Sequence, residues 1–278
     1  MNFEIVPAYE LSLAEQAKVF NAAFAGYVGG SFELSPASLA SFISFQGIDL
    51  CYSRFARNGN GQLASFGYIN RTGNIPRLAG MGTVADARRS GAAGFVLGCL
   101  LEEAQQRGDE AMVLEVIEQN PPAVSLYRAY GFDSLMRLQG WRGSSSDAPA
   151  ATDVIALREI PIAEALRLPA ALDYPELPWQ ISRHAAAKVT SARAYASGDV
   201  AAVIGDPKVS PIRLHGFPGF DGTNWGLLRG LTSAVMAEFF DREFYALPVF
   251  PEPFGRELFQ PLKFRQEKIS QFLMRKNL

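Results

Sequence analysis

Apolar residues in the first half of the chain alternate between strand-like runs and helix-like spacing, which predicts a mixed α and β fold. Helices are expected where apolar side chains recur every three or four positions, and strands where short apolar runs end at turn-forming residues. Two expected strands flank Asn58-Gly59-Asn60-Gly61, a strong hairpin signal. The elements predicted in chain order are a strand at 3–8, helices at 13–24 and 36–45, strands at 51–57, 63–70 and 78–84, a helix at 94–106, a strand at 112–117, a helix at 123–130 and a strand at 135–141.

A short turn of arginine, glycine and other small residues joins the strand at 78–84 to the helix at 94–106. It consists of Arg88-Arg89-Ser90-Gly91-Ala92-Ala93-Gly94. Small residues let several backbone N–H groups point at one place, and the N-terminal end of the following helix favours an anion there. An arginine pair alone is typical of a solvated surface, but beside these glycines it favours an anion site. We interpret the turn as a pyrophosphate site.

A stretch rich in serine, alanine and aspartate follows the last strand of this half. It covers residues 142–153, RGSSSDAPAATD, and its composition is typical of a linker. The sequence therefore predicts two domains, 1–145 and 152–278, which a length of 278 residues allows. A strand-like run from Val154 and a helix-like pattern at 227–240 indicate a second mixed domain.

The composition narrows the range of functions. A net charge of −2 gives no general attraction to nucleic acid or to an anionic membrane. We recognise neither a signal peptide nor an apolar run long enough to span a membrane. The spacing of Cys51 and Cys99 fits neither a metal site nor a disulfide framework. We expect a cytoplasmic monomer or homodimer without metal, nucleic-acid or membrane partners.

Three motifs in the first half resemble those of the GNAT superfamily of N-acetyltransferases. Arg88-x-x-Gly91-x-Ala93 is similar to the turn with which that family binds the pyrophosphate of acetyl-CoA. Leu114-Glu115-Val116 stands where the family has a splayed strand. Asn120-x-x-Ala123-x-x-Leu126-Tyr127-x-x-x-Gly131-Phe132 resembles the motif after that strand. In this order and spacing the three are specific, and the resemblance covers residues 3–142.

The resemblance implies an α+β fold, with a mixed, mostly antiparallel central sheet flanked by helices, and acetyl-CoA as co-substrate without a metal. Backbone N–H groups of the turn would bind the pyrophosphate. Thr83 and Val84 would bind the pantetheine through their backbone, and Asn120 would contact its arm. The implied coenzyme-binding set is Thr83, Val84, Arg88, Arg89, Ser90, Gly91, Ala92, Ala93, Gly94 and Asn120.

Acetyl transfer to an amine also needs groups that move protons. The resemblance implies Tyr127 as the general acid that protonates the coenzyme A sulfur, with Tyr130 as its rival. A tyrosine on a helix is equally typical of a side chain that packs in the core and has no catalytic role. The base stays open between Glu115, acting through water, and Glu33 in the loop after the first helix. The position of Glu115 is equally typical of a structural carboxylate.

The second half is interpreted as a diverged copy of the first, so that the fold is expected twice. A shift of 132 positions places Tyr127 on Phe259, and the strand at 112–117 on FYALPV at 244–249. The corresponding turn at 220–226 contains no arginine. We therefore expect acetyl-CoA in the first half only, and assign no catalytic role to the histidines of the second half.

The predicted function is acetyl-CoA-dependent N-acetyl transfer to a small-molecule or amino-acid-like amine, by direct attack in a ternary complex. A protein N-terminus or a lysine side chain is an alternative acceptor. Two other classes stay open: a non-catalytic acyl-CoA-binding regulatory protein and a nucleotide-binding protein. Aromatic residues that either line an acceptor pocket or pack in the core are Phe20, Phe24, Tyr27, Phe32, Phe42 and Phe45.

Overall fold

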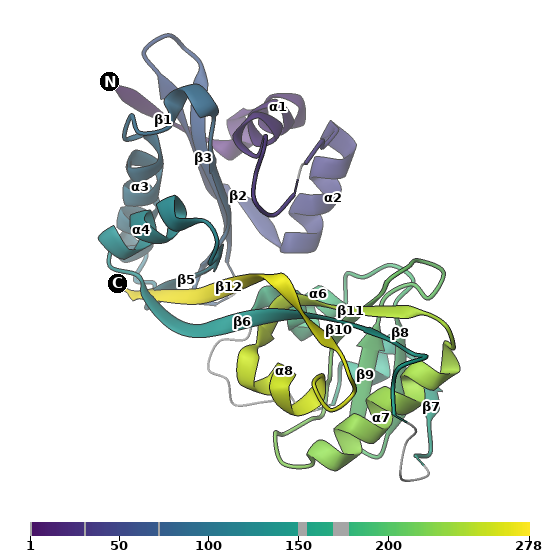
Figure 1. Cartoon of the computed structure of the whole chain (residues 1–278). Helices are drawn as coiled ribbons and strands as arrows, with labels where there is room; N and C mark the ends of the chain where they lie inside the picture. Colours follow the sequence, from purple (N-terminus) through teal and green to yellow (C-terminus); the bar gives the residue numbers. More distant parts are fainter. Residues whose placement is uncertain (1, 31, 72, 150–154, 169–177) are drawn as a thin grey trace. The chain divides into compact units, whose positions relative to one another are not determined.

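The computed structural model describes residues 2–30, 32–71, 73–149, 155–168 and 178–278, and the chain forms two compact units (Figure 1). The first is Met1–Leu135 together with Phe272–Leu278, and the second is Met136–Gln271. These bounds differ from the predicted domains, 1–145 and 152–278. The predicted linker starts inside a strand, since Asp133–Ser144 forms β6, and its residues 150–153 lie outside the described part of the chain.

The first unit contains a mixed, mostly antiparallel sheet (Figure 1). Its strand order is β1-β2-β3-β4-β5, followed by the last residues of β12. Neighbours from β1 to β4 are antiparallel, whereas β4 and β5 are parallel. The strands are β1 (Phe3–Pro7), β2 (Ile48–Asn58), β3 (Leu63–Asn70), β4 (Arg77–Thr83), β5 (Ala111–Ile117) and β12 (Arg265–Asn277).

Helices cover both faces of this sheet. Helices α1 and α2 pack on one face, around Phe20 and Phe66, and α3 and α4 pack on the other, around Val96 and Met112 (Figure 1). The predicted α+β class is therefore confirmed. The helices are α1 (Leu13–Ala23), α2 (Pro36–Gln46), α3 (Ala92–Gln106) and α4 (Pro121–Ala129), with short 3-10 turns η1 (Ala8–Glu10) and η2 (Ala85–Ala87).

Local sequence explains where the first two helices begin and end. The backbone N–H of Glu15 donates to Ser12 Oγ at 3.3 Å, and Ser12 N donates to the Glu15 carboxylate at 2.9 Å, which is a capping box. Ser35 caps α2, with Pro36 in its first turn. Helix α2 ends at Gly47, whose φ of 63° suits glycine.

The C-terminal residues of the chain complete the first unit. Leu278 N donates to Glu110 O, next to the start of β5, at 3.1 Å. Met274 is fully buried in the same core as α3 and α4, and Phe272 and Leu278 pack against that core. The predicted division at a linker missed this because composition marks a polar stretch but does not show which strand a distant segment pairs with.

Strands β4 and β5 separate toward their C-terminal ends. Their register joins Arg77 to Val113 and Leu78 to Leu114. No further register pair joins them among the described residues, although β4 continues to Thr83 and β5 to Ile117. Diverging parallel strands form a wedge that exposes backbone groups which a ladder would otherwise use. The strand ends at this wedge lie near the first turns of α3 and α4.

The second unit repeats this order of elements. Its series β10-α7-β11-α8-β12 corresponds to β4-α3-β5-α4-β6, and β10 is parallel to β11. Its strand order is β12-β6-β11-β10-β9-β8-β7, in which β12 contributes its first residues. The remaining elements are β7 (Arg158–Ile160), α5 (Ile162–Ala165), η3 (Trp179–Ile181), α6 (Arg183–Ala186), β8 (Arg193–Ser197), β9 (Val200–Ile204), β10 (Ile212–Gly216), α7 (Trp225–Glu238), β11 (Glu243–Pro251) and α8 (Glu252–Leu258).

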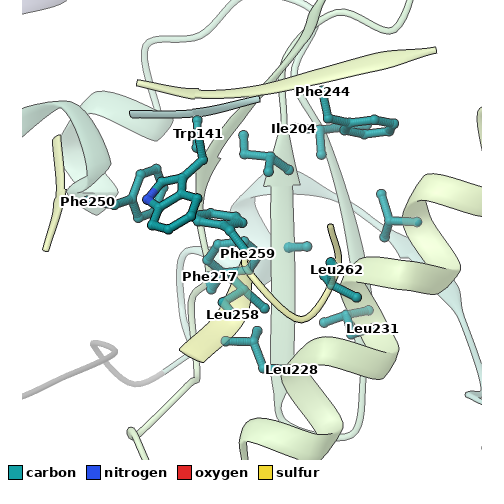
Figure 2. Packing of buried hydrophobic residues seen from close by; sticks show 14 of the residues in the cluster. Trp141, Ile204, Phe217, Leu228, Leu231, Phe244, Phe250, Leu258, Phe259 and Leu262 are labelled. Atoms are coloured by element: carbon teal, nitrogen blue, oxygen red, sulfur yellow. The ribbon is translucent and has the colours of Figure 1, made fainter. Parts of the chain in front are cut away.

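Aromatic side chains fill the part of the second unit that corresponds to the wedge. The ring of Phe217, just after β10, lies 5.8 Å from that of Phe254 and 6.3 Å from that of Phe259. Figure 2 shows Trp141 packed with Phe217 and Phe259 in this cluster. A Cβ on Gly255 would lie 2.1 Å from Trp141 Nε1, so α8 lies directly on the indole. Side chains of the second unit therefore fill the space that corresponds to the wedge of the first unit.

Candidate functional site

A cavity of about 890 Å³ lies at the open end of the wedge in the first unit. Its walls come from the end of α1 and the turn after it, the end of β4, the turn before α3, and α4. Three predicted site residues, Val84, Ser90 and Glu115, lie outside the cavity walls. The predicted site residues that line it are Thr83, Arg88, Arg89, Gly91, Ala92, Ala93, Gly94, Asn120 and Tyr127.

The turn before α3 presents backbone N–H groups to the cavity. Arg89 and Gly91 have φ values of 63° and 91°, a left-handed conformation that reverses the chain. Phe95 N donates to Gly91 O at 2.9 Å, which starts the hydrogen-bond ladder of α3. The N–H groups of Ala93 and Gly94 precede that ladder. Together with the helix dipole, they make this wall suited to an anionic group.

The polar side chains of the turn make different contacts. Ser90 Oγ donates to Ala87 O at 2.6 Å and so stabilises the turn itself. The guanidinium of Arg88 donates to Ala23 O, at the end of α1, at 3.2 Å. Arg89 is exposed and lines the cavity. Arg88 therefore joins the turn to α1, while Arg89 adds a cation at the cavity.

Gly94 lies against Tyr130. The Tyr130 hydroxyl donates to Gly94 O at 2.8 Å, and a Cβ on Gly94 would lie 2.6 Å from that hydroxyl oxygen. One turn later in α3, a Cβ on Gly98 would lie 3.7 Å from the Tyr130 ring, an ordinary van der Waals distance. Only Gly94 is therefore required by the packing of Tyr130.

The two glycines provide a matched test of this packing. Gly94→Ala is expected to lower the free energy of unfolding by about 1–3 kcal/mol, because the new methyl group displaces Tyr130. Gly98→Ala is expected to raise it by about 0.5–1 kcal/mol, because alanine favours the helix and finds space. Urea unfolding followed by circular dichroism measures both. Equal effects of the two substitutions would contradict the packing described.

Tyr127 reaches the cavity from α4 and is buried. Burial, with a smaller contribution from the neighbouring Tyr27, raises the pKa of its hydroxyl well above that of an exposed tyrosine. The hydroxyl therefore stays protonated at neutral pH and is available as a hydrogen donor. Tyr130 is the poorer proton donor of the two, since its hydroxyl hydrogen is already directed to Gly94 O.

Tyr27, considered from the sequence as an aromatic of either an acceptor pocket or the core, lines the cavity and brings a hydroxyl to it. It lies in the connection between α1 and α2, and its hydroxyl hydrogen-bonds the side chain of Asn120. Burial raises the pKa of Tyr27, and the bond to Asn120 partly opposes this. Tyr27, Asn120 and Tyr127 line the same cavity. The available signal was a tyrosine within the glycine-rich stretch GYVGGS, where a turn rather than a helix face sets its direction.

The aromatic residues of α1 and α2 divide into two groups. Phe20 is 2% exposed and belongs to the core under these helices, and Phe32 and Phe42 pack against that core. Phe24 packs against the same core and also lines the cavity, as does Tyr27. Core packing thus accounts for three of the residues considered for an acceptor pocket.

Val84 does not fit its expected role. Its N–H donates to Ala64 O at 3.0 Å and is therefore committed to the fold, its carbonyl accepts from Ala87 N at 3.0 Å, and the residue lies outside the cavity walls. Thr83 lines the cavity, with its hydroxyl 2.9 Å from Ser65 Oγ. Backbone binding of pantetheine stays a prediction for Thr83 and lacks support for Val84.

Glu115 does not fit the role of a base either. Arg77 Nε donates to its two carboxylate oxygens at 3.0 and 2.8 Å, and the side chain of Glu115 is 3% exposed. Arg77 also donates to Gln46 Oε1 at 3.0 Å, which connects β4 and β5 to the end of α2. The carboxylate of Glu115 is thus engaged by the guanidinium of Arg77, and Glu115 lies outside the cavity walls. Glu33, the alternative, is exposed and also lies outside them.

The histidines lie in the second unit. His215, in β10, is buried, and burial together with Arg213 lowers its pKa to about 3, so it is neutral at neutral pH. His184 stacks on Trp179, with ring centroids 5.8 Å apart. In the described ranges, no three His, Cys, Asp or Glu side chains gather as metal ligands would. Likewise, no helix within the described ranges has the length and apolar character needed to cross a membrane.

Comparison with known proteins matches part of the chain to a family model and nearly all of it to solved structures. Residues 31–132 match the model of the acetyltransferase (GNAT) family. A GCN5-related N-acetyltransferase from Kribbella flavida is 15% identical with a TM-score of 0.66, over 100% of this chain and 71% of that chain. No curated protein matches the sequence.

Two further solved structures cover almost the full length of both chains. A GCN5-related N-acetyltransferase from Sphaerobacter thermophilus is 13% identical with a TM-score of 0.62, over 99% of this chain and 95% of that chain. A tandem GNAT protein from the clavulanic acid biosynthesis pathway is 13% identical with a TM-score of 0.60, over 99% and 98%. At such identities the likeness establishes the fold.

Proposed function

We propose, given that residues 31–132 of this chain belong to the GNAT acetyltransferase family, that the chain transfers an acetyl group from acetyl-CoA to the amine of a small-molecule or amino-acid-like acceptor. The observation that carries the proposal is that an anion-binding helix start and a buried, protonated Tyr127 line one cavity. The filled wedge of the second unit supports a single coenzyme site, in the first unit.

The residues at the cavity fit the chemistry of coenzyme A. Its pyrophosphate needs converging N–H donors and positive charge, and the turn at Gly91–Gly94 with Arg89 offers both. Its pantetheine arm carries amides that hydrogen-bond to backbone N–H and C=O groups. In the described part of the chain, the diverging strands beside Thr83 leave such groups without a partner strand across the wedge. The reactive thioester would then lie toward Asn120 and Tyr127, deeper in the same cavity.

Bound acetyl-CoA supplies an activated acetyl carbonyl and a thiolate leaving group. The neutral acceptor nitrogen attacks the carbonyl carbon and the carbon–sulfur bond breaks. The nitrogen loses one proton to solvent, the departing thiolate gains one from Tyr127, and solvent reprotonates the tyrosinate, so the products are an amide and the coenzyme A thiol. Tyr127 would donate its hydroxyl hydrogen to the departing sulfur. Asn120, oriented by Tyr27, would hold the arm beside it. Neither Glu33 nor Glu115 lines the cavity, so the proposal gives the amine proton to solvent.

Calorimetric titration with coenzyme A, acetyl-CoA and ATP tests the donor, and release of free thiol across a panel of amines tests the transfer. We expect binding of both coenzyme A forms, no binding of ATP, and thiol release with one class of small amine. Peptides with a free N-terminus or a lysine distinguish the alternative acceptors. Binding of acetyl-CoA without thiol release from any amine would favour a regulatory protein instead.

A further inference from the structure

The connection between α1 and α2 is held by hydrogen bonds at both ends. Tyr27 N donates to Phe24 O at 3.1 Å, and Gly30 N donates to Tyr27 O at 3.0 Å, which closes two consecutive turns after α1. At the other end, the side-chain amide of Asn21 bonds the N–H and the carbonyl of Leu34 at 2.9 and 3.0 Å. The aromatic side chains of this connection therefore have a defined position at the cavity.

Phe24 is enclosed by other aromatic rings. Its ring centroid lies 4.6 Å from that of Phe20, 5.3 Å from that of Phe32 and 4.9 Å from that of Tyr27. Interlocked rings resist displacement, because moving one leaves a void that its neighbours cannot fill. Phe24 also lines the cavity, so its surface there is rigid.

Tyr27 is fixed in a different way. A Cβ on Gly29 would lie 2.7 Å from the Tyr27 ring and 2.8 Å from Ile117 Cδ1, so ring, glycine backbone and the end of β5 are in close contact. The hydroxyl at the far end of the ring is hydrogen-bonded to Asn120. Both ends of the side chain are therefore held, and the ring cannot swing away without breaking one contact.

Both rings line the same cavity as Asn120 and Tyr127, toward which the proposed function directs the thioester. With the pyrophosphate at the turn before α3 and the sulfur at Tyr127, the acyl chain extends past Tyr127. Tyr27 lies near enough to Tyr127 to interact with it electrostatically. We propose that Phe24 and Tyr27 form a fixed aromatic wall that admits an acetyl or propionyl group and excludes longer acyl chains. This wall rests on the proposed function, since Tyr127 defines where the sulfur lies.

Calorimetric titration of the full chain with coenzyme A, acetyl-, propionyl- and hexanoyl-CoA tests the wall. We expect the wild type to bind hexanoyl-CoA at least roughly tenfold more weakly than acetyl-CoA, because apolar pockets discriminate by about that factor or more for each methylene that does not fit. Tyr27→Ala is expected to remove most of this difference by opening space. Tyr27→Phe keeps the ring and is expected to keep the selectivity.

Two further variants serve as control and as replacement. Tyr9→Ala removes an exposed tyrosine outside the cavity walls, 58% exposed, and is expected to leave the order of affinities unchanged. Tyr27→Leu shortens the side chain but keeps apolar packing, and gives the same test if Tyr27→Ala does not fold. Equal wild-type affinity for acetyl- and hexanoyl-CoA, or selectivity unchanged in the shortened variants, overturns the wall and leaves the proposed function standing. Failure of coenzyme A itself to bind overturns both.

Discussion

Replacing Tyr127 by phenylalanine is expected to lower the rate of thiol release by roughly 100- to 10,000-fold, the range typical for loss of a positioned general acid. The substitution removes one hydroxyl from a buried ring that packs 5.9 Å from Phe132, so the fold and the cavity are expected to persist. The affinity for acetyl-CoA should change little. Steady-state kinetics and calorimetric titration of the same preparation separate the two quantities.

Tyr130→Phe is the matched control for this substitution. It removes the hydrogen bond to Gly94 O and is expected to lower the free energy of unfolding by about 1 kcal/mol. Its effect on the rate should be far smaller than that of Tyr127→Phe. If Tyr130→Phe abolishes thiol release and Tyr127→Phe does not, the roles of the two tyrosines are reversed. If neither variant changes the rate, no tyrosine acts as the acid.

Truncation after Gln271 is expected to unfold the first unit and to abolish acetyl-CoA binding. The deleted residues, Phe272–Leu278, bring Met274 into the core beneath α3 and α4, with Phe272 and Leu278 against that core. Each large apolar side chain contributes about 1.5–3 kcal/mol on burial, and a domain has only about 5–15 kcal/mol in total. The truncation also removes the strand beside β5.

Calorimetric titration with acetyl-CoA and limited proteolysis measure the effect of this truncation. Asn277→Ala is the control, because Asn277 is exposed, and surface substitutions usually change stability by less than about 0.5 kcal/mol. We expect protease cleavage of the truncated chain within residues 1–135 and a control that resists it. Unchanged binding by the truncated chain would show that the first unit is complete without its C-terminal strand.

Features of the first unit that depend on neighbouring residues were predictable from sequence. The Asn58–Gly61 turn forms between β2 and β3, with Gly61 N bonded to Asn58 O at 2.9 Å. Ser12 and Ser35 cap the helices they precede. The turn that begins at Arg88 leads into α3, which starts at Ala92, two residues before the predicted start, after Gly91 in a left-handed conformation that glycine favours.

Val84 and Glu115 show why the rest of the site was not predictable. Each has a distant partner that its own motif does not reveal, Ala64 for the backbone of Val84 and Arg77 for the carboxylate of Glu115. The sequence offered Tyr27 only as an aromatic side chain, and its bond to Asn120 was not predictable. Its partner Asn120 lies far along the chain, and no local pattern connects a tyrosine in a glycine-rich turn to the start of α4.

By itself, the sequence determined the order of helices and strands in the first unit and the glycine-bearing turn before α3, because backbone conformation at caps and glycine turns depends on adjacent residues. Only the tertiary structure decided that Phe272–Leu278 complete the first unit and that aromatic rings fill the wedge of the second. It also decided that Phe24 and Tyr27, rather than the other aromatic residues of α1 and α2, line the cavity. These outcomes depend on contacts between residues far apart in the chain. Hydrophobic patterning shows which side chains are buried but not which distant residues they pack against.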